Sequence, residues 1–173
     1  DSTSGKRDRV IIDVVRHERA YGDLSGMAGT PSAAGTLWRF TLDLRDGTVE
    51  EKRLAKKPIE SPEVDPRVRG REHRFVYGVT ADGALLRQDV VRGVTRVREL
   101  GAGRRAEQPV YVPRPGTSAE GGGWLLVVVH DFASSTSELL ILNAEDPCGP
   151  AIATVHLPVA QPCSVHTRWQ PGG

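Results

Sequence analysis

Three side chains that could do chemistry gather near the C-terminal end of the sequence. Cys163, His166 and Trp169 follow one another at intervals of three residues, and prolines stand on both sides of them. An imidazole can bind a metal or carry a proton, whereas chain ends are usually frayed and chemically idle. Two hypotheses follow. Either the segment is simply packed, or it is tied down because His166 is one member of a site whose other members lie elsewhere.

Other familiar signatures of catalytic and metal sites do not occur in the sequence. Cys148 and Cys163 are too few for a disulfide framework or a zinc site, and no C-x-x-C pair is present. There is no phosphate-binding glycine loop, nucleophile elbow or H-E-x-x-H motif. The glycines at 121–123 precede a predicted strand and not a helix, which favours a turn over a phosphate cradle.

The charge balance argues against a polyanion as partner. The chain has 23 basic and 22 acidic residues, a net charge of +1. Arginines recur in RVRGREHR (67–74) and RVRELGAGRR (96–105), but they alternate with apolar and acidic residues. This alternation favours solvated strand faces over a nucleic-acid site. No apolar run approaches the roughly 20 residues of a membrane helix, and no signal peptide is found. We therefore expect a soluble cytoplasmic protein.

The elements that must position these residues are β-strands. Short runs rich in β-branched and apolar residues recur at regular spacing, and three pairs of them flank hairpin turn signals in RDG, TADG and RG. The predicted strands are Arg9 to Val15, Thr36 to Leu44, Val49 to Leu54, Arg74 to Val79, Leu85 to Val91, Val94 to Leu100, Pro109 to Val112, Gly123 to His130, Glu138 to Asn143 and Ile152 to Leu157. This pattern is typical of a β-sandwich, barrel or propeller.

The remaining sequence predicts loops and no helix. Apolar residues never settle to a spacing of 3.6 over a dozen residues. Residues 22–34 are rich in Gly, Ser, Ala and Pro, and residues 56–71 are interrupted by three prolines. We predict that both stretches are long and irregular, and such loops in compact all-β proteins are often functional.

Four stretches together carry a resemblance to a known family. They are IESPEVDPRVRGREHRFVYG at 59–78, EQPVYVPRPGTSAEGGGWLLVVVHD at 107–131, SELLILNAEDPCGPAIATVHLP at 137–158 and SVHTRW at 164–169. Their order and spacing resemble the C-terminal part of the carotenoid cleavage oxygenases, a family that includes lignostilbene and apocarotenoid dioxygenases and the retinal isomerohydrolase. The resemblance covers nearly the whole chain but only a C-terminal portion of the family's length.

The resemblance implies the C-terminal blades of a seven-bladed β-propeller, with residues 1–173 forming part of one domain. In the family, four histidines from four blades hold a catalytic iron, and three glutamates hydrogen-bond to three of those imidazoles. The implied activity is that of a non-haem iron(II) dioxygenase. It would cleave a C=C double bond of a carotenoid, apocarotenoid or stilbene-like substrate with O2, giving two carbonyl products. Neutral imidazoles suit ferrous iron.

Carried over by residue, the resemblance makes His166 the last iron ligand, although the two residues after it depart from the family's usual small ones. An imidazole ligand needs its second nitrogen oriented, usually by a carboxylate. Glu60 matches one of the family's orienting glutamates. The other aligns with Gln108, and Glu107 stands one place earlier. Either the start of the strand shifts by one residue, or an amide replaces the carboxylate.

The rest of the implied site lies outside the chain. The family's third ligand histidine belongs to a motif that would precede Asp1, so three iron ligands, one orienting glutamate and most of the substrate tunnel are expected upstream. We therefore expect the chain to be part of a longer protein and inactive alone. Its exposed blade faces would be covered by the missing N-terminal part or by another copy, and any peripheral membrane contact would belong to that N-terminal part.

The other titratable candidates match no ligand position. His17, His73, His130 and His156 are expected to be ordinary strand or loop residues. Cys163 is expected to be a packing residue, because the family does not use thiolate ligands. A second hypothesis belongs to a different class of protein: a metal-free β-propeller or β-sandwich interaction module whose arginine-rich loops bind a partner. Iron content separates the two hypotheses.

Overall fold

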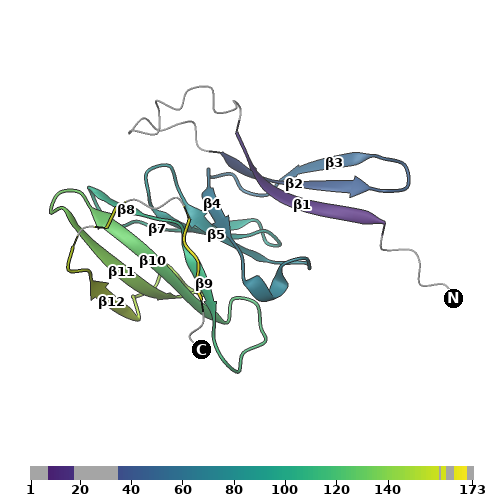
Figure 1. Ribbon diagram of the computed structural model, residues 1–173. Helices are drawn as coiled ribbons and strands as arrows, with labels where there is room; N and C mark the ends of the chain where they lie inside the picture. The colour runs from purple at the N-terminus through teal and green to yellow at the C-terminus, as the bar shows by residue number, and fades with distance from the viewer. Residues whose placement is uncertain (1–7, 18–34, 160, 163–165, 171–173) are drawn as a thin grey trace.

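The computed structural model describes residues 8–17, 35–159, 161–162 and 166–170. Within these ranges twelve strands form three antiparallel sheets, which stand side by side in a row (Figure 1). The described part of the chain contains no α-helix, and none of its helical segments is long and apolar enough to cross a membrane. The all-β prediction is therefore confirmed for these residues.

The three sheets follow the order of the chain. The first sheet pairs β1 (Arg9–Arg16), β2 (Thr36–Asp43) and β3 (Val49–Arg53). The second pairs β4 (Glu60–Glu63), β5 (Phe75–Val79), β6 (Leu85–Asp89) and β7 (Val94–Arg98). The third contains β8 (Arg104–Ala106), β9 (Val110–Pro113), β10 (Gly123–Asp131), β11 (Thr136–Asn143) and β12 (Ala153–His156), with β8 and β9 both paired to β10.

All ten predicted strands are present, with ends within two residues of those expected. The prediction was wrong for residues 56–71, which contain β4 and the 3-10 helix η3 (Pro66–Val68). Pro62 lies inside β4, and the pairing of β4 with β5 changes register between Glu60 and Glu63. Such a bulged edge strand gives no alternating pattern. The predicted loop at 22–34 lies outside the described residues.

The second sheet is enclosed on both faces, which is the packing expected of propeller blades. Along β5, Phe75 and Tyr77 join the core cluster shared with the third sheet, whereas Val76 joins the cluster shared with the first. Neighbouring residues on β6 divide in the same way, with Leu85 on one side and Leu86 on the other. Alternation of side chains along a strand thus builds two separate cores from one sheet.

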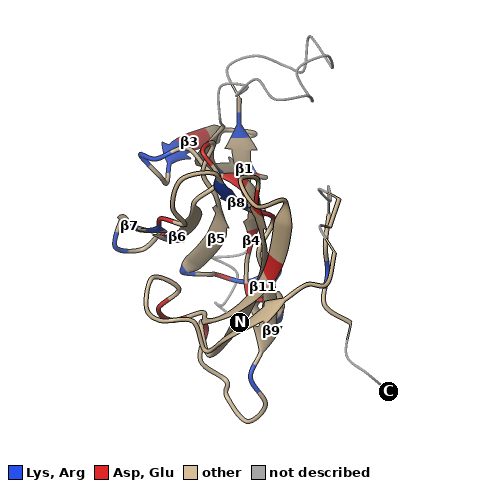
Figure 2. Ribbon diagram, turned by 90° about the vertical axis from the view of Figure 1, so that its left-hand side faces the viewer, with Lys and Arg blue, Asp and Glu red and all other residues tan. Residues whose placement is uncertain are grey.

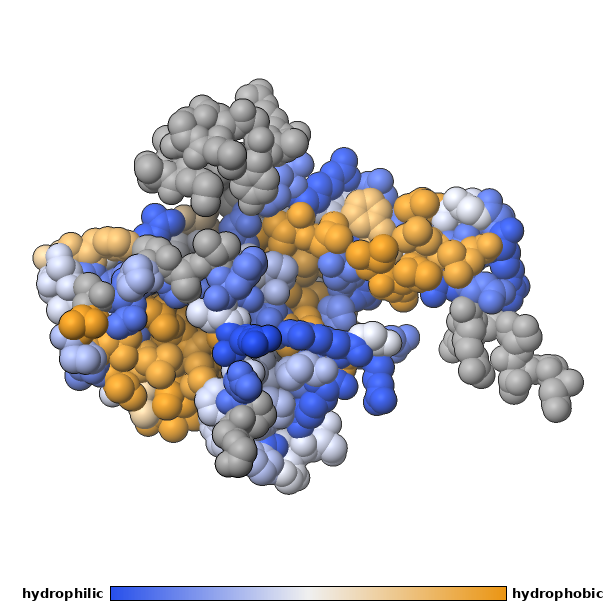
Figure 3. Space-filling model, in the orientation of Figure 1, coloured by the Kyte–Doolittle hydropathy of each residue, from blue (hydrophilic) through white to orange (hydrophobic). Residues whose placement is uncertain are grey.

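The outer faces of the first and third sheets carry apolar side chains that the described residues do not cover. On β1, Val10 and Ile12 are about two-fifths exposed, and their cross-strand neighbours on β2 are Leu42 and Phe40. On the third sheet, Val155 of β12 is 45% exposed. Figure 3 shows the two apolar areas, one over β1 and β2 and the other over β10–β12. The expected open blade faces are therefore present in the described part of the chain.

Candidate functional site

His166 contacts Gln108, which lies two residues before the strand β9. Its Nδ1 lies 3.3 Å from Oε1 of Gln108, and the Thr167 hydroxyl donates to the Gln108 carbonyl oxygen at 3.4 Å. An amide oxygen can only accept, so the Gln108 contact requires a proton on Nδ1. In a neutral imidazole with this tautomer, Nε2 carries the lone pair that a metal needs. The His166 side chain is exposed, which leaves that nitrogen accessible.

Glu107 points to a different histidine. Its Oε1 lies 2.8 Å from Nε2 of His130, and both side chains are 8% exposed. The sequence left open whether Glu107 or Gln108 takes the place of the family's second orienting glutamate, and of the two it is Gln108 that contacts His166. Successive residues of an extended chain point to opposite sides, so the two neighbours serve two different imidazoles. Nothing in the sequence pattern indicated the contact between Glu107 and His130.

Glu60 begins β4 and also contacts an imidazole. Its Oε1 accepts the backbone N–H of Gly35 at 2.7 Å, and its Oε2 lies 3.6 Å from Nε2 of His17. His17 was expected to be an ordinary strand or loop residue, and its place beside Glu60 was not foreseen. Carboxylate and imidazole are 43 positions apart in the sequence, and only the packing of the first sheet on the second brings them together.

The backbone around Glu60 is fixed by an unusually close approach. A Cβ atom on Gly78, in the neighbouring strand β5, would lie 2.6 Å from the carbonyl oxygen of Glu60 and 2.6 Å from Cγ1 of Ile59. Ser61 takes a φ of 49°, a left-handed conformation that costs energy for any residue but glycine. A strained β-bulge that packs directly against Gly78 therefore fixes the position of Glu60.

Glu60 and Gln108 occupy matching places in adjacent sheets. Glu60 starts β4, an edge strand of the second sheet, and Gln108 precedes β9, an edge strand of the third. The link between these edges is Arg67 of η3. Its guanidinium pairs with Asp65 at 2.7 Å and donates to the Tyr111 hydroxyl on β9 at 3.3 Å. The two candidate residues thus lie along the same edge of the row of sheets.

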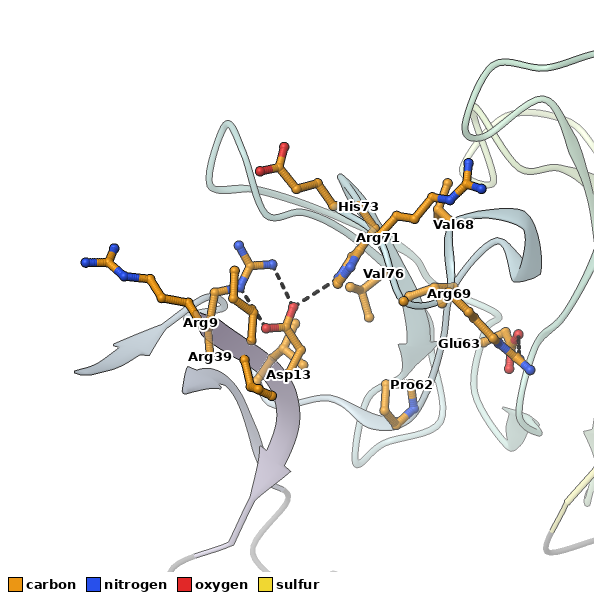
Figure 4. Close-up of a pocket in the computed structure, with 16 residues that line it drawn as sticks. Arg9, Asp13, Arg39, Pro62, Glu63, Val68, Arg69, Arg71, His73 and Val76 are labelled. Atoms are coloured by element: carbon orange, nitrogen blue, oxygen red, sulfur yellow. Dashed lines mark hydrogen bonds and ion pairs between the residues drawn. The ribbon is translucent and has the colours of Figure 1, made fainter. Parts of the chain in front are cut away.

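A second polar cluster lies in a cleft between the first and second sheets. The cleft has a volume of about 670 Å³ and is bordered by β1 and by residues 62–73 (Figure 4). Inside it Asp13 accepts two hydrogen bonds from Arg39, at 2.7 and 2.8 Å, and lies 3.0 Å from His73 Nε2. Burial alone would raise the pKa of Asp13, but these partners outweigh it and lower that pKa to about 2.

The arginine-rich stretches are largely engaged within the protein. Arg74 pairs with Asp89 at 2.7 Å, and Arg69 pairs with Glu63 at the same distance. Figure 2 shows basic and acidic residues interspersed along the strands and turns. Among the described residues, no group of three or more His, Cys, Asp or Glu side chains is placed to hold a metal. Cys163 lies outside the described residues, and Cys148 is a half-buried free thiol.

Comparisons with known proteins agree on one family. The family model described as retinal pigment epithelial membrane protein matches residues 3–171. Apocarotenoid-15,15'-oxygenase of Synechocystis is 38% identical over 143 residues, 78% of this chain and 29% of that protein. A carotenoid cleavage oxygenase of Mycobacterium tuberculosis is 30% identical over 175 residues, 94% of this chain and 34% of that protein.

The likeness extends to three dimensions. The crystal structure of cobalt-substituted Synechocystis apocarotenoid oxygenase matches with a TM-score of 0.81 and 32% identity, covering 91% of this chain and 36% of that one. The match confirms the predicted propeller-blade architecture. The chain spans about a third of the length of these relatives.

Proposed function

Because the chain belongs to the family of the retinal pigment epithelial membrane protein and the carotenoid cleavage oxygenases, we propose that it is the C-terminal portion of a non-haem iron(II) dioxygenase. The complete enzyme would cleave a C=C double bond of an apolar carotenoid, apocarotenoid or stilbene-like substrate with O2. The relatives support an oxygenase of this class, since they are named for the cleavage of carotenoids and apocarotenoids. The observation that carries the proposal is the contact between His166 and Gln108.

His166 fits the role of one metal ligand. Its Nδ1 is directed at an amide oxygen, so the imidazole is oriented, and Nε2 is on an exposed side chain. Iron, when bound, would supply the dioxygen chemistry. One imidazole cannot hold iron(II) against water, and the described residues offer no second cluster of ligands. The remaining ligands would come from histidines outside this chain. The cobalt-substituted relative supports a site that accepts a divalent transition metal.

Gln108 and Glu60 would orient ligand imidazoles from the edges of two adjacent blades. Gln108 is the residue beside His166, where an amide accepts the N–H but adds less basicity than a carboxylate. Glu60 uses Oε1 for the Gly35 N–H, and the distance of 3.6 Å from Oε2 to His17 exceeds a hydrogen bond. A carboxylate accepts several hydrogen bonds, so Glu60 can also accept the N–H of a ligand imidazole that enters from upstream.

Metal analysis tests the proposal directly. The complete protein should contain close to one iron per chain and convert an apocarotenoid or stilbene into two carbonyl products, whereas the isolated chain should contain no stoichiometric iron. In the complete protein His166→Ala should lose the iron. His156→Ala is the matched control, because the His156 side chain is 86% exposed and matches no ligand position.

Two results would overturn the assignment. Tightly bound iron in the isolated chain would show that the site is not shared with an upstream segment. A complete protein without metal or activity would leave the metal-free interaction module as the better hypothesis.

A further inference from the structure

A chain of hydrogen bonds runs through the third sheet from Glu107 to the C-terminal segment. Glu107 contacts His130 Nε2 at 2.8 Å, and His130 Nδ1 lies 3.0 Å from the hydroxyl of Ser137. The same hydroxyl accepts the backbone N–H of Gln161 at 3.0 Å. His130 and Ser137 are directly opposed residues on β10 and β11, and they are 6% and 3% exposed.

The donors and acceptors of this chain are complementary when His130 is a neutral imidazole. The Glu107 carboxylate accepts, so Nε2 of His130 carries the proton and Nδ1 is an acceptor. Nδ1 then accepts a hydrogen bond from the Ser137 hydroxyl, and the oxygen of that hydroxyl accepts a hydrogen bond from the Gln161 N–H. Every buried polar atom named here has a partner, which is the condition for a buried network to fix one geometry.

The network ends at Gln161, which is near the proposed metal ligand in the sequence. Gln161 precedes His166 by five residues, and residues 166–167 return to Gln108. The C-terminal segment is therefore held at two points. One is Gln108 itself, and the other is reached from Glu107, the adjacent residue, through His130 and Ser137.

Simple packing does not account for the composition of this site. His130 lies on the face of β10 opposite to the apolar core, and its neighbours on that face, Leu126 and Val128, are apolar and partly buried. An apolar pair at 130 and 137 would fill space without the cost of burying polar groups. It would leave the Gln161 N–H and the buried Glu107 carboxylate without these contacts, so the polar residues serve the attachment of the segment.

We propose that His130 and Ser137 are positioning residues for His166. With Glu107 and the Gln161 N–H they fix the position of Gln161 beside Ser137, and this position limits where the His166 imidazole, five residues later, is presented. The inference rests on the proposed function, because it takes His166 to be a metal ligand. Glu107 and Gln108 thus have different roles. Glu107 acts on the C-terminal segment through His130, whereas Gln108 contacts the ligand imidazole directly.

The test is Ser137→Ala in the complete protein, with two readouts. Cobalt binding to the metal-free protein, measured by competition with a chelator, should weaken about tenfold, the lower end of the usual loss when the support of a ligand is removed. Hydrogen exchange of residues 159–170 should become faster. Ser137→Thr, which keeps the hydroxyl, should recover both properties. Ser134→Ala is the control, because Ser134 lies on the exposed turn between β10 and β11.

The outcomes separate this inference from the proposed function. A wild-type complete protein that binds no cobalt or iron would refute the proposed function. A wild-type protein that binds metal, with Ser137→Ala unchanged in cobalt affinity, would refute the positioning role, whatever happens to hydrogen exchange. Faster exchange with unchanged affinity would show that the network merely attaches the chain end.

Discussion

Asp13 should make the stability of this fold depend on pH in a defined acidic window. It lies in the cleft between the first two sheets, where Arg39 donates two hydrogen bonds to it and His73 approaches at 3.0 Å. The hydrogen bonds to Asp13 raise the pKa of the Arg39 guanidinium, and the negative charge of Glu72 also helps to raise it. Because His73 leads into the second sheet, ionised Asp13 ties β1 to the neighbouring blade (Figure 4).

The magnitude follows from the lowering of its pKa from 3.8 to about 2. At about 1.4 kcal/mol for each pKa unit, the ionised carboxylate contributes at most roughly 2.5 kcal/mol. The site is open to water at the cleft, and screening reduces this to about 1–2 kcal/mol. Since the folded-state pKa is depressed, the contribution is complete above pH 3.8 and is lost as the pH falls through about 2.

Urea unfolding at a series of pH values between 7 and 2 checks this expectation. Asp13→Asn should lower the free energy of unfolding of the complete protein by about 1–2 kcal/mol at pH 7, and the gap to wild type should close toward pH 2. Asp8→Asn is the matched control. Asp8 pairs with Arg45 on the surface, where both side chains are about half exposed, and its loss should cost much less than the loss of Asp13. A gap that does not change with pH would refute the reasoning.

Three further predictions concern the site and the open blade faces. In the complete enzyme, Glu60→Gln should lower iron affinity or activity by roughly ten- to a hundredfold; unchanged iron content and rate would make Glu60 an ordinary loop acid. Gln108→Glu should raise cobalt affinity several-fold in a chelator competition, because a carboxylate at 3.3 Å from His166 Nδ1 makes the imidazole a stronger donor; equal or weaker binding would contradict the assigned contact. The isolated chain should be oligomeric or prone to aggregate in sedimentation experiments, since its outer sheet faces expose apolar side chains; a clean monomer that melts cooperatively would show a self-contained β domain.

The sequence predicted the strands well because most of them are built from local apolar patterns. Gly123 to His130 and Glu138 to Asn143 are found where expected, since burial of one face gives each strand its own signal. The strand β4 escaped prediction because a proline and a left-handed serine interrupt it. That strand carries Glu60, so the least regular strand of the second sheet holds one of the candidate residues.

The candidate site was only partly predictable, because its contacts join residues far apart in the chain. His166 and Gln108 are 58 positions apart, and the motif match named both without showing that they touch. The choice between Glu107 and Gln108 depends on which side of the chain each residue faces, and a one-residue shift reverses that. The partners of His17 and His130 are set by packing between sheets and across strands, which composition and spacing do not encode.

The glycine beneath Glu60 has a consequence for how sequences of this kind can diverge. Any side chain at position 78 would collide with the backbone oxygen of Glu60 and with Ile59. A substitution at Gly78 would move the strand that carries Glu60. Selection for Glu60 therefore also constrains Gly78, although the glycine has no reactive side chain. We expect Gly78 to accompany Glu60, eighteen positions apart. The dependence runs one way: because the colliding atoms are a backbone oxygen and Ile59, a lineage that lost the glutamate would still require glycine at position 78.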